Sequence, residues 1–304
     1  MTFKQLEALF WVVQAGGFAQ AASRLHTTQS AISKRVHELE AMFDIPLFDR
    51  TLRSARLTDK GQQMFLTAKR LLEQRDAAVE QFQRPEVLER HVRIGVTELT
   101  AMTWLPRLIS AIQIRYPKVI IEPYVDASAM LRDKLLADDV DIMLVAHAAA
   151  EDERLVTTRI GVVENAWMCK PGLVGSRKRL AMTELAAFRL LTQDDRSGTG
   201  LLYNRWLDSI GVAPQNTLFS NSLVTLIGLT ISGMGVSYLP KKCLREMIKA
   251  GSLQVLSVNP NLPPAPYAAV YRADRKSELL SVITSLAKEF CDFGTIFQSD
   301  VLKP

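Results

Sequence analysis

Short polar side chains gather near the start of the chain, at the beginning of a segment with helical periodicity. Gln29 and Ser33 are four residues apart, so they share one face of the predicted helix. Amide, hydroxyl and ammonium groups address base edges and phosphates, and a helix fits the major groove of B-form DNA. The candidate base contacts are Gln29, Ser30, Ser33 and Lys34.

Further candidates for DNA contact flank this helix. Thr28 precedes it, at the positive helix end where a phosphate is favoured. Arg35 is either a phosphate contact or a solvated helix charge. Residues 50–56 carry basic side chains and no acidic one, and these either follow the DNA backbone, enter the minor groove or remain solvated. The three basic residues are Arg50, Arg53 and Arg56.

Short helices are expected to position these side chains. Apolar residues at helical spacing predict a first helix that ends near residue 16, a second over 18–25 and a third over about 29–40. Two helices joined by a tight turn form a helix-turn-helix, although a helical hairpin in another bundle has a similar pattern. Two short extended pieces, 45–50 and 56–58, predict a small wing hairpin.

A long amphipathic helix is predicted from about Asp59 to Gln83, and Pro85 ends it. Its apolar positions approximate a heptad seam that Arg75 interrupts. Such a helix between domains usually pairs with a second copy of itself, and the alternative is packing within the monomer. The apolar positions are Met64, Phe65, Ala68, Leu71, Leu72, Val79 and Phe82.

From residue 91 the pattern changes to alternating strands and helices, which predicts an α/β region with a parallel sheet and helices on both faces. The Pro-rich stretch 259–266 is predicted to cross between two lobes. The predicted strands are 91–96, 119–121, 141–145, 166–169, 190–191, 236–239 and 268–271. The predicted helices are 103–115, 128–136, 201–210, 223–232, 240–248 and 277–290.

Hydroxyl groups at predicted helix starts indicate a ligand site in this region. Thr97 and Thr100 follow the first strand, where hydroxyls and backbone N–H groups cradle an anion or simply cap the helix. Ser128 opens a helix that faces the same cleft. His147 follows the third strand, where open α/β sheets place ligands, or else lies at the surface. Glu98 would repel an anion and leaves a zwitterionic or cationic ligand open. The candidates in the second lobe are Ser197, Thr199 and Asn221.

The overall composition is that of an ordinary globular protein. The 304 residues are 48% hydrophobic and 23% charged, which excludes a disordered chain. No apolar run approaches the roughly 20 residues of a membrane helix, and no secretory signal is expected. The net charge of +5 is weak evidence for nucleic acid. Three scattered cysteines indicate a reducing compartment, as buried free thiols or as a redox switch.

Motifs of enzyme chemistry are not found in this sequence. A nucleophile elbow, a P-loop, a dinucleotide fingerprint and a metal-ligand triplet are all missing. We therefore expect neither an enzyme nor a bound cofactor or metal.

The order of motifs resembles LysR-type transcriptional regulators over the whole chain. The stretch AASRLHTTQSAISKRVHELE, followed by IPLFDR and RLTDKG, is similar to the DNA-binding domain of that family. RIGV, WLPRLISAIQIRYPKVIIE, DDVDIML and ISGMGVSYLP are similar to its C-terminal domain. The wing departs from the pattern, because Leu52-Arg53-Ser54 stands where many members carry glycine.

This resemblance implies three parts of the chain. A winged helix-turn-helix would occupy 1–58, a linker helix for dimerisation 59–88, and an effector-binding domain 89–304. The last part would have two α/β lobes, similar to type 2 periplasmic binding proteins. The expected boundaries are about 91–161 and 267–304 for lobe I and about 162–266 for lobe II.

The resemblance also implies a bacterial cytoplasmic regulator that binds promoter double-stranded DNA under the control of a small-molecule effector. Thr97 and Thr100 match positions where family members often contact the effector. The effector is left open as a carboxylate or an amino-acid-like metabolite. A homodimer or homotetramer is expected, with RNA polymerase as a further partner and no membrane. The alternatives are a regulator that needs no effector, a small-molecule binding protein and, remotely, an enzyme.

Overall fold

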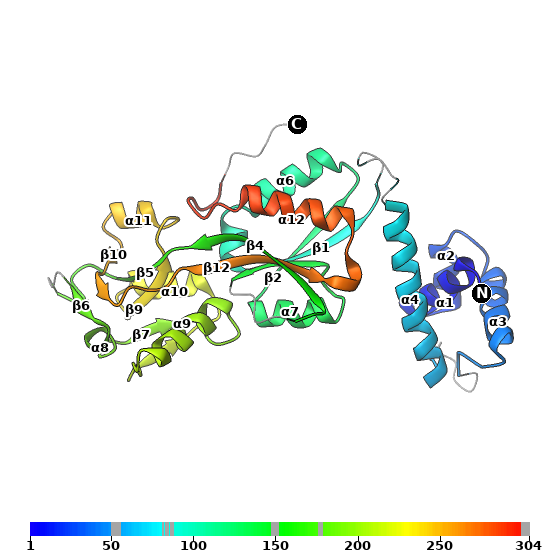
Figure 1. Ribbon diagram of the computed structural model, residues 1–304, viewed down its shortest axis with the longest axis horizontal. Coiled ribbons are helices and arrows are strands. Elements are labelled where there is room, and N and C mark those ends of the chain that lie inside the picture. The colour runs from blue at the N-terminus through cyan, green and yellow to red at the C-terminus, as the bar shows by residue number, and fades with distance from the viewer. Residues whose placement is uncertain are drawn as a thin grey trace. The chain divides into compact units, whose positions relative to one another are not determined.

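Two compact units, Met1–Phe82 and Gln83–Pro304, make up the chain in the computed structural model. The first unit is helical, and the second contains two five-stranded sheets with their helices (Figure 1). The structure describes residues 1–49, 56–80, 82, 85, 88–146, 152–175 and 179–298.

Three short helices surround one apolar core in the first unit. α1 (Phe3–Gln14) begins at a capping box, in which the hydroxyl of Thr2 accepts from the backbone N–H of Gln5. α2 (Phe18–Arg24) and α3 (Gln29–Phe43) follow, joined by the predicted short turn. This arrangement confirms the predicted helix-turn-helix. The buried core side chains include Leu6, Leu9, Val12, Ile32, Val36 and Leu39.

A buried carboxylate attaches the next segment to α3. Glu40 Oε1 accepts hydrogen bonds from the backbone N–H groups of Leu47, at 2.8 Å, and Phe48, at 3.4 Å. Phe48 then pairs with Leu57 in an antiparallel bridge. The predicted wing hairpin thus has a paired base, and residues 50–55 lie outside the described residues.

α4 (Asp59–Glu80) packs along α1 within the same chain. Phe65 stacks on Phe10 with ring centroids 5.8 Å apart, and Arg75 pairs with Glu7. Part of the predicted heptad seam is therefore covered inside the monomer, as in the alternative to a dimer helix. Further along α4 and just beyond its end, Leu66, Val79 and Phe82 are exposed.

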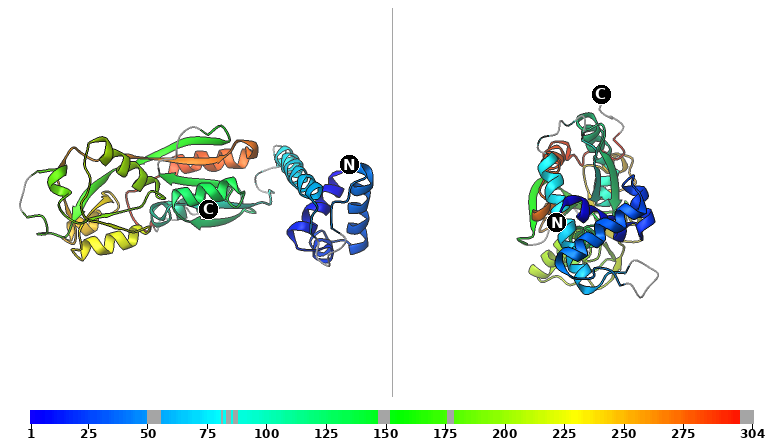
Figure 2. Two further views of the ribbon diagram at one scale, coloured as in Figure 1. Left: turned by 90° about the horizontal axis from the view of Figure 1, so that it is seen from below. Right: turned by 90° about the vertical axis from the view of Figure 1, so that its right-hand side faces the viewer.

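Lobe I of the second unit is built on a sheet with the order β2-β1-β3-β12-β4. Its strands are β1 (His91–Val96), β2 (Ile120–Val125), β3 (Ile142–Ala146), β4 (Leu155–Val163) and β12 (Ala265–Arg272). Its helices are α5 (Glu98–Met102), α6 (Leu105–Arg115), α7 (Ser128–Leu136) and α12 (Glu278–Phe290). α7 covers one face of the sheet, and α6 and α12 cover the other (Figures 1 and 2).

Lobe II is built on a second sheet, with the order β10-β5-β9-β7-β8. The strands are β5 (Asn165–Cys169), β7 (Leu190–Thr192), β8 (Thr217–Phe219), β9 (Val236–Pro240) and β10 (Gln254–Val255). The helices are α8 (Met182–Leu185), α9 (Gly198–Ser209), α10 (Leu223–Ile231) and α11 (Arg245–Lys249). A small ladder pairs β6 (Leu180–Ala181) with β11 (Val258–Asn259).

Both sheets are mixed: the predicted parallel pairing is confirmed for β2-β1-β3 and for β9-β7-β8, and the remaining strands pair antiparallel. The chain leaves lobe I through β4 and returns through β12, so β12 runs antiparallel to both β3 and β4 (Figure 1). In lobe II, β5 runs antiparallel to β9 and β10. The nine-residue strand β4 was not predicted, and the helix predicted over 240–248 is reduced to the five residues of α11.

The cysteines are free, and two of them lie in the cores of the second unit. Cys169 and Cys243 are buried, and Cys291 is partly buried. Burial raises the pKa of Cys243 to about 11 and that of Cys291 to about 12. These thiols fit the predicted buried free cysteines.

In the described part of the chain, no helix is both long enough and apolar enough to cross a membrane.

Candidate functional site

α3 presents a polar face away from the core of the helical unit. Its apolar residues Ile32, Val36 and Leu39 are buried against α1 and α2. Because residues three and four apart share a helix face, the opposite side carries the predicted DNA contacts. The exposed candidates are Gln29, Ser30, Ser33 and Lys34, and Arg35 is half-buried.

The start of α3 is defined by its cap. The Thr28 hydroxyl accepts from the N–H of Ala31 at 3.2 Å and lies 3.0 Å from the hydroxyl of Ser30. Thr28 is thus occupied as a helix cap, while the N-terminal turn of α3 remains exposed. Among the wing arginines, Arg56 is exposed at the base of the hairpin. Arg50 and Arg53 lie outside the described residues.

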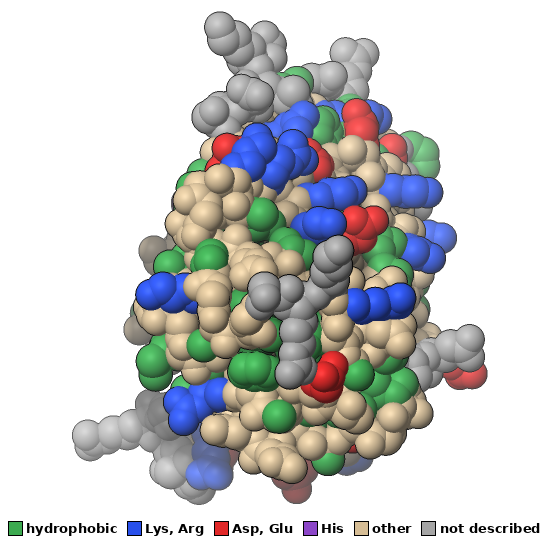
Figure 3. Space-filling model, turned by 90° about the vertical axis from the view of Figure 1, so that its left-hand side faces the viewer, with side chains coloured by type: hydrophobic (Ala, Val, Ile, Leu, Met, Phe, Trp, Pro, Cys, Tyr) green, Lys and Arg blue, Asp and Glu red, His purple; other side chains and the backbone are tan. Residues whose placement is uncertain are grey.

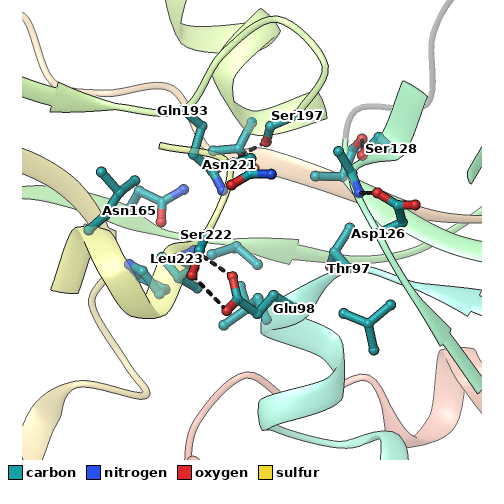
Figure 4. A pocket seen from close by; sticks show the side chains of 18 of the residues that line it. Thr97, Glu98, Asp126, Ser128, Asn165, Gln193, Ser197, Asn221, Ser222 and Leu223 are labelled. Atoms are coloured by element: carbon teal, nitrogen blue, oxygen red, sulfur yellow. Dashed lines mark hydrogen bonds between the residues drawn. The ribbon is translucent and has the colours of Figure 1, made fainter. Parts of the chain in front are cut away.

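A cavity of about 250 Å³ lies between lobe I and lobe II (Figure 4). It is lined from lobe I by the loops after β1 and β2 and the end of β3, where polar side chains approach the cleft. It is lined from lobe II by the segments that begin α9 and α10. Of the sequence candidates, the structure brings together Thr97, Ser128, Ser197, Thr199 and Asn221.

One sequence candidate does not line this cavity, and another lies outside the described residues. Thr100 is fully buried and does not line the cavity, and its hydroxyl lies 3.3 Å from that of Thr97. Its burial within lobe I does not favour the expected contact with an effector, which stays a prediction. His147 lies outside the described residues.

The Thr97 hydroxyl is fixed by a residue far along the chain. It lies 3.1 Å from the hydroxyl of Tyr267 on β12. Burial raises the pKa of Tyr267, so its hydroxyl stays protonated. The bond sets the position of Thr97 at the carboxyl end of β1, where the cavity begins.

Several lining residues were missed by the sequence analysis. Gln193 follows β7, its N–H donates to the Tyr238 hydroxyl at 2.9 Å, and its Oε1 accepts from the Ser197 hydroxyl at 2.9 Å. Asn165 begins β5 and donates to the Tyr203 hydroxyl at 2.9 Å. Gln193 lies just after the carboxyl end of its strand, which is where open α/β sheets bind ligands. That rule would have found Gln193 once β7 was predicted.

Glu98 joins the two lobes. Its Oε1 accepts from the Ser222 hydroxyl at 3.1 Å, and its Oε2 accepts from the N–H of Leu223 at the start of α10 (Figure 4). Ser222 also caps α10 by accepting from the N–H of Thr225. The carboxylate of lobe I therefore lies at the positive end of a helix in lobe II, a favourable position for a negative charge.

Asp126 is the second acidic residue of the lining. It accepts from Lys134 Nζ at 2.9 Å and from the N–H of Ala127 at 2.8 Å. Burial alone would raise the pKa of Asp126, but these hydrogen bonds outweigh it and hold the pKa below its usual value. This carboxylate is thus neutralised by lobe I itself.

The lobes touch on the other side of the cavity. The N–H of Ala129 donates to the carbonyl of Arg196 at 3.0 Å. A Cβ at Gly198 would lie 2.0 Å from the carbonyl oxygen of Ala146, so only glycine fits there. The cavity is accordingly bounded by two contacts between the lobes, one at Gly198 and one at Glu98.

Metal binding has no support in the described residues. Among them, no group of three or more His, Cys, Asp or Glu side chains is placed to hold a metal ion.

Two family models match the chain. Residues 3–62 match the bacterial regulatory helix-turn-helix protein, lysR family, and residues 85–292 match the LysR substrate binding domain. The helix-turn-helix and the strands and helices of both lobes fall within these matches. Together they cover more than half of the chain, and most of α4 lies between them.

Curated relatives align with most of the chain. The HTH-type transcriptional activator AaeR of Escherichia coli (strain K12) is 25% identical, over 97% of this chain and 96% of its own length. The HTH-type transcriptional regulator CzcR of Bacillus anthracis is 24% identical, over 83% of this chain and 85% of its own.

Solved structures share the fold at low identity. A full-length OxyR variant from Pseudomonas aeruginosa has a TM-score of 0.68 at 21% identity, covering 100% of this chain and 99% of its own. Full-length LysG from Corynebacterium glutamicum, with bound effector Arg, has a TM-score of 0.61 at 19% identity, covering 97% and 99%. At these identities the likeness concerns the fold alone.

Proposed function

The chain belongs to the LysR family of bacterial transcriptional regulators. We propose that its first unit binds DNA and its second unit binds a small-molecule effector. The exposed face of α3 reads promoter DNA, and the cavity between the lobes binds a small effector that alters this binding. The observation that carries the proposal is the cavity itself, which lies between two lobes joined by the Glu98–Ser222 hydrogen bond.

The DNA-binding role rests on the exposed polar residues of α3. Gln29, Ser33 and Lys34 lie on a helix whose opposite side is buried, so its polar face is free to enter a major groove. Arg56 at the base of the hairpin adds a positive charge for a phosphate. We assign base contacts to α3 and backbone contacts to Thr28, Arg35 and Arg56.

The effector role rests on polar groups that converge from both lobes. Thr97 and Ser128 approach from lobe I, and Ser197, Thr199 and Asn221 from lobe II. LysG, which shares the fold, was solved with an arginine effector, and this supports a small-molecule role for the same region here. This proposal requires that the two lobes can adopt more than one arrangement. A ligand held by both lobes shifts the population toward one arrangement only to the extent that it binds that arrangement more tightly.

We further propose a homo-oligomer in the bacterial cytoplasm. Leu66, Val79 and Phe82 are exposed on and just beyond α4, and Phe82 is 88% exposed. Exposed apolar side chains along and just beyond this helix favour burial against another copy. This proposal places residues 59–88 as the linker between the DNA-binding part and the effector-binding part.

The DNA-binding proposal is tested with the full chain and labelled duplexes. Fluorescence anisotropy across a salt series compares the duplex from the region upstream of the gene with a random duplex of equal length. We expect tighter binding to the upstream duplex and a loss of affinity as salt rises. Equal, weak binding to both duplexes would contradict sequence reading by α3.

The effector proposal is tested by adding metabolite pools to the same assay. A pool that contains the effector raises the melting temperature of the protein and changes its affinity for the upstream duplex. Asn221→Ala, in the cavity lining, should weaken this response, while Gln215→Ala, exposed in lobe II outside the lining, should not. A DNA affinity that no pool changes would favour a regulator that needs no effector.

A further inference from the structure

The charges around the cavity select the charge of its ligand. We propose that the cleft binds a small molecule with a positively charged group, an ammonium or a guanidinium, held by the carboxylate of Glu98. This inference rests on the proposed effector site and names the chemical class of its ligand.

Basic side chains are missing from the described lining of the cavity. The two charged residues there are Glu98 and Asp126, and no described lining residue is Lys, Arg or His. Lobe II does carry basic residues, and Lys and Arg side chains are spread over the outer face seen in Figure 3. The exposed ones near α11 are Lys241, Lys242, Arg245 and Lys249, none of which lines the cavity.

An anionic ligand would therefore lose hydration without gaining a counter-charge from the described lining residues. Burial of an unpaired carboxylate is strongly unfavourable. It would also lie near Glu98, whose like charge repels it. Both effects act against a carboxylate effector and in favour of a cation.

Glu98 differs from Asp126 in its partners. Asp126 has the ammonium of Lys134, whereas the described contacts of Glu98 are a hydroxyl and a backbone N–H. Neutral donors leave the formal charge of Glu98 without a cation. An ammonium or guanidinium on the ligand would supply one, as a charge-assisted hydrogen bond.

The start of α10 also disfavours an anionic ligand. The N-terminus of a helix commonly binds anions, and α10 begins at the cavity. Here the N–H of Leu223 already donates to Glu98, and the N–H of Thr225 donates to Ser222. The chain's own carboxylate thus occupies the position that a ligand carboxylate would need.

The other lining residues indicate which groups the ligand carries besides its positive charge. Thr97, Ser128, Asn165, Gln193 and Asn221 present hydroxyl and amide groups, which bind neutral polar groups. The volume of about 250 Å³ is that of about eight water molecules, so the ligand is a small metabolite. A compact amine that also carries hydrogen-bonding groups fits this description.

Binding of a cation at Glu98 would compete with the contact between the lobes. The bonds from Ser222 and Leu223 are made by the same two oxygens that the ligand would use. A ligand that weakens them favours a different arrangement of lobe I and lobe II. The charge of the ligand and its effect on the lobes are thereby linked through one residue.

The test uses three five-carbon probes that differ in charge: 1,5-diaminopentane, pentane-1,5-diol and glutarate. Their dissociation constants for the full-length protein are measured by calorimetry at fixed pH and ionic strength. We expect the diamine to bind at least about tenfold more tightly than the diol, as a hydrogen bond to a charged group predicts. Glutarate should bind most weakly.

Three variants test whether Glu98 causes the preference for the diamine over the diol. Glu98→Gln should remove the preference for the diamine, Glu98→Asp should keep most of it, and Glu289→Gln, an exposed acid on α12, should leave it unchanged. Melting temperatures report whether each variant folds, and Glu98→Asp preserves the test if Glu98→Gln does not fold.

Several outcomes would overturn the inference. One is tighter binding of glutarate than of the diamine. The second is that Glu98→Gln still prefers the diamine over the diol, and the third is that no probe binds at millimolar concentration. Tight glutarate binding that also alters DNA affinity would leave the proposed function intact. The proposed function fails separately, when no metabolite pool changes binding to the upstream duplex.

Discussion

Thr97 and Tyr267 lie 170 positions apart in sequence, and their hydroxyl oxygens are 3.1 Å apart. One residue follows the first strand of lobe I, and the other belongs to β12, which returns from lobe II. The hydrogen bond therefore connects the edge of the cavity to the strand that links both lobes.

Removing this hydroxyl should have a small, measurable effect on stability. Tyr267→Phe should lower the free energy of unfolding by about 1 kcal/mol, because it removes a buried hydrogen bond. Urea unfolding followed by Trp fluorescence measures it. Tyr271→Phe is the matched control, since Tyr271 is also buried on β12 without a described hydrogen bond. Equal losses in both variants would show that the bond to Thr97 contributes nothing.

Replacement of two residues on α3 should separate specific from non-specific DNA binding. The double variant Gln29→Ala, Ser33→Ala should lose about 1–3 kcal/mol of affinity for the upstream duplex and little for a random duplex. Anisotropy titrations with both duplexes measure this. Gln62→Ala, an exposed residue on α4, is the control. The same loss on both duplexes would argue against base contacts.

The buried carboxylate of Glu40 should be essential for the stability of the helical unit. Glu40→Ala leaves the N–H groups of Leu47 and Phe48 without their acceptor and should destabilise the unit by about 1–3 kcal/mol. Glu40→Gln keeps one acceptor oxygen and should cost less. Circular dichroism during thermal unfolding compares the two variants. If Glu40→Gln is as damaging as Glu40→Ala, the carboxylate acts through its charge instead.

The cysteines should react slowly in the native protein. Burial raises the pKa of Cys243 to about 11, well above the usual value of about 8.5, so its thiolate is scarce at pH 8. Alkylation by iodoacetamide, followed by mass spectrometry, should be at least about 100-fold slower than in urea. Similar rates in both conditions would contradict the burial of this thiol.

The same shift gives a pH dependence of stability. The native thiols of Cys243 and Cys291 keep their protons to a higher pH than the unfolded thiols do. The unfolded state therefore binds fewer protons above about pH 8.5, and stability falls as the pH rises further. Urea midpoints between pH 8 and 10 measure this. Replacing both cysteines with Ser should reduce the slope.

The helical unit was predictable because its signals are local. Thr28 as a cap and the spacing of Ile32, Val36 and Leu39 predict α3 without reference to the rest of the chain. The mixed sheets were not predictable in this way. β12 joins β3 and β4 only after the chain has built lobe II, and the direction of a strand is not encoded in its own alternation.

The cavity was predictable in part for the same reason. Thr97, Ser128 and Ser197 lie at or beside helix starts, which short polar residues mark in a sequence. Thr100 fulfils the same pattern, but it lies within α5 and is buried, whereas Thr97 is the extended residue that precedes the helix. The contact of Glu98 with Ser222 joins residues 124 positions apart, and nothing local to either residue indicates it.

The close approach of Gly198 to Ala146 is a tight contact between the two lobes at one end of the cleft. Lobe I and lobe II touch there through backbone atoms, and a Cβ at position 198 would meet the carbonyl oxygen at 2.0 Å. A rotation of the lobes about this point would change the distance between Glu98 and Ser222, which is 3.1 Å here. The added methyl group of Gly198→Ala would push the two lobes apart at this contact. The variant would therefore favour a different arrangement of the lobes even without a ligand.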